Sequence, residues 1–175
     1  QTNRKYFSFD VNNLLYFINI AIMMHKYDLF DWIFDQKIEP KTLTNQYLMD
    51  LASASVISGN IHSFIRCVDK GLTFTNNHKQ KLTEFLKISS EFGYYQLTEF
   101  IISLFNDGKL NAEISESSMI FGNISIFKIF SGLKNFHFDY DRLLSIALVK
   151  NYNDIAYYII ENLYQPKSKE FIISI

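Results

Sequence analysis

Apolar residues recur along this chain in pairs of short segments, and a polar turn separates the two members of each pair. Residues 142–163 show the pattern most clearly. Ile155, Tyr158 and Ile159 have the i, i+3, i+4 spacing that places side chains on one face of an α-helix. Asp154 precedes them at a position typical of a helix start. The pattern predicts two short amphipathic helices joined by a tight turn.

The same unit recurs four more times. The predicted turn positions are His25, Gly59, Gly93, Gly122 and Asn151, which are 34, 34, 29 and 29 residues apart. Four positions earlier, every copy has a small residue: Ala21, Ser55, Ser89, Ser118 and Ala147. A small side chain at this position allows two helices to approach closely. A repeat of about 30 residues is typical of stacked helical units.

These copies predict an all-α chain that forms a single repeat domain over residues 1–175. The repeats cover roughly residues 11–40, 41–73, 74–110, 111–140 and 141–165, and residues 166–175 begin a further or capping unit. Ser115, Ser117 and Ser118 replace apolar residues in the first helix of the fourth copy. Because serine side chains compete for backbone hydrogen bonds, this copy is expected to be the least stable.

The unit resembles a divergent ankyrin repeat. Gly59-Asn60-Ile61 and Gly122-Asn123-Ile124 match the Gly-Asn turn and the aliphatic second helix of that family best. No copy has the Thr-Pro-Leu-His helix start of the family, and Pro40 and Pro166 are the only prolines. The resemblance therefore implies an ankyrin-like solenoid of about five stacked helix-turn-helix repeats with short or missing β-hairpins. Eroded copies of this kind are similar to those common in ankyrin proteins of protists and large DNA viruses.

Other helical architectures stay open at this point. Tetratricopeptide units also have about 34 residues, although their pattern of small and aromatic residues differs, and armadillo or HEAT units are longer. An irregular helical bundle would explain alternating helices. It would not explain the recurrence of a small residue, a turn and an aliphatic pair.

The resemblance also implies where a partner would bind. In ankyrin-like units the two residues before the turn project from the first helix toward the concave side. Most of these positions are apolar here, and the candidate partner-binding residues are Met23, Met24, Ile57, Phe92, Ile120, Phe121 and Val149. An exposed apolar strip is typical of a protein-binding groove. The alternative is that short hairpins draw these side chains into the core between repeats.

Composition limits the classes of partner and compartment. Apolar residues make up 48% and charged residues 20% of the chain, and the net charge is −1, so no general attraction to nucleic acid or anionic membranes is expected. The longest apolar run, Leu14–Met24, is shorter than the ~20 residues that span a bilayer. The single cysteine, Cys67, is consistent with a reducing compartment and is expected to pack in the core. We therefore expect a cytoplasmic protein.

No sequence motif predicts a catalytic, metal-binding or cofactor-binding site. The histidines His25, His62, His78 and His137 lack metal-ligand spacing, and no phosphate-binding glycine loop or nucleophile motif is present, so no cofactor, metal site or catalytic residue is expected. The resemblance gives His25 and His62 backbone-bonding or solvent-facing roles. Asp28 is expected to start a helix, with Asp31 and Asp35 on its solvated face.

Aromatic residues gather in the predicted second helices, where core or outer-helix packing is expected rather than base stacking: Phe30, Trp32, Phe34, Phe64, Phe100, Phe127, Phe130, Tyr157 and Tyr158. The favoured function is a non-catalytic, monomeric scaffold that binds another protein. The alternative is a targeting or regulatory module of a larger enzyme whose catalytic domain lies outside this sequence.

Overall fold

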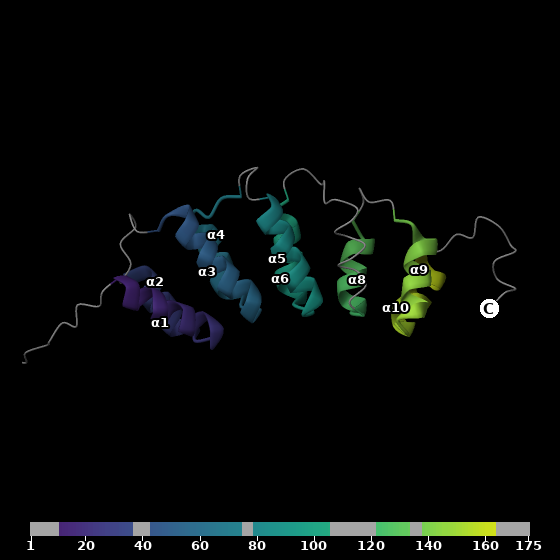
Figure 1. Ribbon diagram of the computed structural model, residues 1–175, viewed down its shortest axis with the longest axis horizontal. Coiled ribbons are helices and arrows are strands. Elements are labelled where there is room, and N and C mark those ends of the chain that lie inside the picture. The colour runs from purple at the N-terminus through teal and green to yellow at the C-terminus, as the bar shows by residue number, and fades with distance from the viewer. Residues whose placement is uncertain (1–10, 37–42, 75–78, 106–121, 134–137, 164–175) are drawn as a thin grey trace, which may run out of the picture. The chain divides into compact units, whose positions relative to one another are not determined.

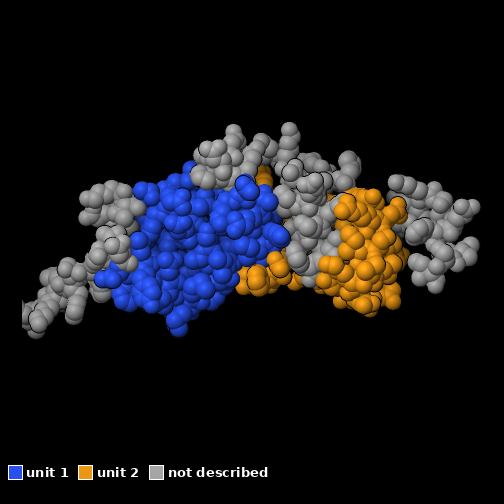
Figure 2. Space-filling model, viewed as in Figure 1, with its two compact units in different colours: residues 1–89 blue, residues 90–175 orange. Residues whose placement is uncertain are grey.

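The computed structural model describes residues 11–36, 43–74, 79–105, 122–133 and 138–163, and within these ranges the chain is helical without a β-strand (Figure 1). The all-α prediction is therefore confirmed for the described residues. The chain divides into two compact units, residues 1–89 and 90–175 (Figure 2), which we describe separately. The single-domain boundary stays a prediction.

Unit 1 contains two helix pairs and most of a fifth helix. Its elements are α1 (Val11–Met23), α2 (Tyr27–Gln36), α3 (Asn45–Ser58), α4 (Ile61–Asp69) and the larger part of α5 (Lys79–Glu91). The first helices α1 and α3 pack against each other, and so do the second helices α2 and α4. Unit 1 therefore has one layer of first helices and one of second helices.

Unit 2 contains α6 (Tyr95–Ser103), α8 (Ile124–Ser131), α9 (Tyr140–Val149) and α10 (Asn153–Tyr158), which continues into the π-helical turn η3 (Ile159–Leu163). Here α8 contacts both α6 and α10, so three second helices form one layer, and α9 packs on α10. The serine-rich segment before α8, and with it the predicted weakness of the fourth repeat, lies outside the described residues, as do residues 166–175.

All five predicted turn positions adopt left-handed backbone conformation. Their φ angles are 52° at His25, 68° at Gly59, 72° at Gly93, 79° at Gly122 and 58° at Asn151. Glycine enters this region freely and asparagine tolerates it, whereas histidine is uncommon there. The turn positions read from the sequence are therefore confirmed at every copy.

Three of the five turns have the hydrogen bonding of a helix C-terminus that ends in a left-handed residue. The backbone N–H after the turn residue donates to the carbonyl of the small residue, from Lys26 to Ala21, from Asn60 to Ser55 and from Tyr152 to Ala147, each at 2.8 Å. The small residues themselves are buried: Ala21, Ser55, Ser89 and Ala147 are at most 1% exposed. Ser118 lies outside the described residues.

Asn60 connects two successive repeats in unit 1. Its Nδ2 donates to the carbonyl oxygen of Ile22, in the preceding repeat, at 3.0 Å, while its Oδ1 accepts from the backbone N–H of Ser63 at 3.1 Å. The side chain therefore caps α4 and at the same time fixes the stacking of α3–α4 on α1–α2. Asn60 is buried, so both bonds are shielded from water.

In unit 2 the residue that follows the turn position, like Asn60 in unit 1, contacts the turn of the preceding repeat. Asn123 caps α8 through its Oδ1, and a Cβ atom added to Gly93 would lie only 2.8 Å from Asn123 Nδ2. Likewise, a Cβ on Gly122 would lie 2.7 Å from a ring carbon of Tyr152. Glycine is therefore required at these two turns for its backbone angle and also for the space that the next repeat occupies.

The core consists mainly of aromatic and aliphatic residues from both layers. Phe30, Phe34, Phe64, Phe127 and Phe130 are buried, which confirms their predicted packing role. Trp32 and Tyr157 are exposed, so the aromatic residues of the second helices do not all belong to the core. Cys67 is buried, as predicted, and burial raises the pKa of its thiol to about 12.

The connector after α4 begins with a glycine cap. Gly71 has a φ of 101° and ends α4 as expected for a C-terminal glycine. Two residues further on, Thr73 bonds with the side chain of Asn45: Oδ1 accepts from the Thr73 N–H at 2.8 Å, and Nδ2 donates to the Thr73 carbonyl at 3.2 Å. An amide side chain therefore pairs with the backbone beside the start of α3. Residues 37–42, 75–78, 106–121 and 134–137 lie outside the described residues, so the expectation of short or missing hairpins stays a prediction.

We predict that Asn60→Ala lowers the free energy of unfolding by about 2 kcal/mol, because it removes a helix cap and the hydrogen bond that Asn60 adds to the Ile22 carbonyl beside the one from the His25 N–H. Urea denaturation measures the change. Asn60→Asp is the matched variant, since it keeps the cap acceptor and replaces the amide donor by a carboxylate oxygen that faces the Ile22 carbonyl. It should therefore destabilise as well. A wild-type stability in Asn60→Asp would contradict the role given to the bond with Ile22.

We predict that Cys67 makes stability fall at alkaline pH. The folded thiol, with its pKa of about 12, keeps its proton above the ordinary value of about 9, at which the unfolded thiol ionises. The unfolded state then binds fewer protons than the folded state, so the contribution of Cys67 to stability is constant well below pH 9 and decreases above it, by about 1.4 kcal/mol at pH 10. Urea denaturation at pH 8 and pH 10 measures this loss. Cys67→Ala should lose correspondingly less, and an identical pH dependence in both proteins would refute the assignment.

Candidate partner-binding surface

The predicted partner-binding residues are exposed wherever the structure describes them. The exposed fractions are 50% for Met23, 61% for Met24, 55% for Ile57, 63% for Phe92 and 82% for Val149. Ile120 and Phe121 lie outside the described residues. The alternative interpretation, in which these side chains enter the core between repeats, is therefore wrong for the five described positions.

Helix geometry explains the exposure. In α1 the buried residues Ile18, Ala21 and Ile22 have i, i+3, i+4 spacing and form the face that contacts the rest of unit 1. Met23 and Met24 follow on the opposite side of the last turn, at the point where the helix ends. The short helices therefore end with apolar side chains directed away from the core.

In unit 1 the equivalent positions belong to neighbouring helices. Met23 and Met24 end α1, Ile57 lies in the last turn of α3, and these two helices pack side by side. Methionine adds flexible, polarizable surface that adapts to different partners. We call Met23, Met24, Ile57, Phe92 and Val149 the pre-turn residues.

In unit 2 the pre-turn residues have apolar neighbours. The Phe92 ring stacks on Tyr94 with centroids 5.8 Å apart and an interplanar angle of 18°. Val149 follows Leu148, which is 43% exposed. Solvent exposure of several large apolar side chains is unfavourable unless another surface covers them.

The aspartates of α2 form an ion-pair cluster with α4. Arg66 Nε donates to Asp31 Oδ1 at 3.1 Å, and the same guanidinium pairs with Asp35 through Nη2. Lys70 Nζ lies 2.9 Å from Asp35 Oδ1, and His62 Nε2 lies 3.0 Å from Asp31 Oδ2. Asp31 and Asp35 therefore share one helix face, as expected, but α4 covers part of it.

This cluster adds a side-chain partner to the roles expected for His62, whose side chain is still 38% exposed. The ring bonds to a carboxylate of the neighbouring repeat rather than to its own backbone, and it lies 5.2 Å from the Tyr27 ring, centroid to centroid. The hydrogen bond from Lys70, together with the charge of Arg66, lowers the pKa of Asp35. The sequence signal for this pairing is the i, i+4 spacing of two acids in α2, Asp31 and Asp35, and of two bases in α4, Arg66 and Lys70.

Asp28 lies in the first turn of α2, as expected. An open depression of about 470 Å³ surrounds this helix start and is lined by His25, Lys26, Tyr27, Asp28 and Leu29.

Within the described ranges, no group of three or more metal-ligating side chains comes together. In the same ranges, no helix is both long and apolar enough to cross a membrane.

Comparison with known proteins identifies no relative. No protein-family model, no curated protein and no solved structure matches the chain. The resemblance to ankyrin repeats therefore stays a prediction from the turn and repeat pattern.

We predict that Asp31 and Arg66 are coupled by about 0.5–1 kcal/mol, the usual range for partly exposed pairs with good geometry. A double-mutant cycle of Asp31→Asn and Arg66→Gln, measured by urea denaturation, gives this value. The coupling should shrink in 0.5 M NaCl because salt screens exposed charges. Additive single effects at low salt would show that the Asp31–Arg66 pair does not contribute to stability.

Proposed function

We propose that the protein is a non-catalytic, ankyrin-like interaction module that binds a partner protein through its pre-turn residues. The observation that supports this proposal is the exposure of all five described pre-turn residues, each at least half exposed. Their side chains are apolar although their position in the helix does not require it. An apolar segment of a partner protein would remove this surface from water.

Two further observations favour the ankyrin-like form of the proposal. The left-handed turn occurs at every copy, and the first and second helices of unit 1 form separate layers. Within unit 1 this arrangement places the ends of the two first helices side by side, on the side that ankyrin repeats use as their concave binding face. Helical repeats generally bind through a continuous surface of this kind.

Photo-crosslinking from single positions tests the proposal. A benzoylphenylalanine at position 24 or 57 should crosslink one and the same protein from a cell lysate, because Met24 and Ile57 are both pre-turn residues of unit 1. The same group at Leu29 or Ile160, which are 43% and 48% exposed on second helices, is the matched control. Equal crosslinking of that protein from the control positions would contradict the proposal.

We predict that Met24→Glu and Ile57→Glu, both in unit 1, abolish recovery of that partner while the melting temperature stays within about 2 °C, because exposed substitutions change stability by less than about 0.5 kcal/mol. Leu29→Glu should retain the partner. Val56→Glu, at a fully buried neighbouring position, should unfold the protein. It is the control for loss of partner recovery that is caused by unfolding. Partner recovery that survives both pre-turn substitutions would refute the proposed surface.

A further inference from the structure

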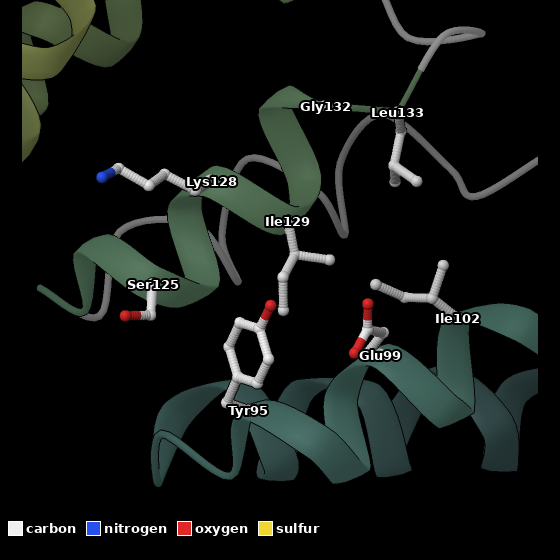
Figure 3. A pocket seen from close by; sticks show the side chains of 8 residues that line it. All are labelled: Tyr95, Glu99, Ile102, Ser125, Lys128, Ile129, Gly132 and Leu133. Atoms are coloured by element: carbon white, nitrogen blue, oxygen red, sulfur yellow. The ribbon is translucent and has the colours of Figure 1, made fainter.

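Unit 2 has a groove between two second helices that the pre-turn residues do not touch. The groove lies between α6 and α8 and has a volume of about 520 Å³, within the roughly 300–1,000 Å³ typical of ligand sites. Figure 3 shows its lining: Tyr95, Glu99 and Ile102 project from α6, and Ser125, Ile129 and Leu133 project from α8 and the residues after it. The groove therefore has an apolar wall and a polar floor.

The carboxylate of Glu99 is the charged group of this floor. The side chain is exposed, and no ion pair joins it to another side chain in the described part of the chain. The one cation among the lining residues, Lys128, extends away from Glu99 in Figure 3, and its Nζ lies 5.1 Å from the centroid of the Tyr158 ring. The groove therefore presents a negative charge that its own lysine does not neutralise.

The described part of unit 2 is acidic as a whole. The described residues of unit 2 include six carboxylates (Glu91, Glu99, Asp139, Asp141, Asp154 and Glu161) against three cations (Lys128, Arg142 and Lys150), a net charge of −3. A surface of this sign attracts a cationic group.

Tyr95 lies one helical turn before Glu99, at i and i+4, so the phenol and the carboxylate are on the same face of α6. Tyr95 is 45% exposed, which leaves its ring accessible. A planar guanidinium can stack on an aromatic ring while its N–H groups form a forked pair with a carboxylate. Its alkyl stem would lie along Ile102 and Ile129.

We propose that this groove binds an arginine side chain of a partner protein. The negative charge selects a cation, the exposed ring and carboxylate select the planar guanidinium, and the isoleucines accept the stem. This inference goes beyond the proposed function, because it concerns the second helices and is tested without the partner. Its failure would leave the pre-turn residues as the proposed surface.

Titration with three short peptides, followed by NMR, tests the proposal on the full chain. The probes are acetyl-Ala-Leu-Xaa-Leu-Ala-amide with arginine, citrulline or lysine at the central position. The arginine peptide should shift the methyl signals of Ile102 and Ile129. Citrulline has the same shape without the charge and should bind about three- to tenfold more weakly, in the range of an exposed charge-assisted contact. Lysine should also bind more weakly, because it lacks the planar fork.

Variants separate the site from general attraction to an acidic surface. Glu99→Gln and Tyr95→Leu should each weaken binding of the arginine peptide by a factor of about three or more, while Glu161→Gln, an exposed carboxylate on η3, should not. Unchanged binding in Glu99→Gln would overturn the proposal. Equal affinity for arginine and lysine would overturn the choice of arginine, and equal affinity for arginine and citrulline would overturn the charge argument.

Discussion

The contact between a left-handed turn and the residue that follows the next turn holds these repeats together. Helices of six to fourteen residues are too short to be stable alone in water, so they depend on tertiary packing. Asn60 supplies such packing through its bond to the Ile22 carbonyl, and Tyr152 does so by lying against Gly122. The left-handed residue reverses the chain and exposes backbone to which the next repeat binds.

Surface features follow from this arrangement. Because each first helix ends at the turn, the residues just before it project beyond the packed core, and five of them carry large apolar or aliphatic side chains. The second helices lie side by side, so side chains of successive repeats meet there. In unit 1 the meeting residues form the Asp31, Asp35, Arg66 and Lys70 cluster, and in unit 2 they leave the groove that contains Glu99.

The contact between second helices therefore has a different polar composition in each of the two units. Between α2 and α4, the acids and bases neutralise one another, and the pKa of Asp35 is lowered as a result. Between α6 and α8, Lys128 turns toward Tyr158 and leaves Glu99 as an available anion. The same backbone arrangement can thus use a pair of facing polar residues for stability in one repeat and leave them open to a ligand in another.

The sequence by itself determined the helix pairs, the five turns and the buried small residues, because turn conformation and helix periodicity are local properties of a few adjacent residues. It also indicated that the pre-turn residues were candidates, without deciding whether they were buried or exposed. Tertiary structure decided that question, since exposure depends on how the repeats pack. Only the structure brought Asp31 to Arg66, Asn60 to Ile22 and Glu99 to Ile129. These pairs come from different repeats, so their meeting depends on the stacking of whole helices and not on any pattern in adjacent residues.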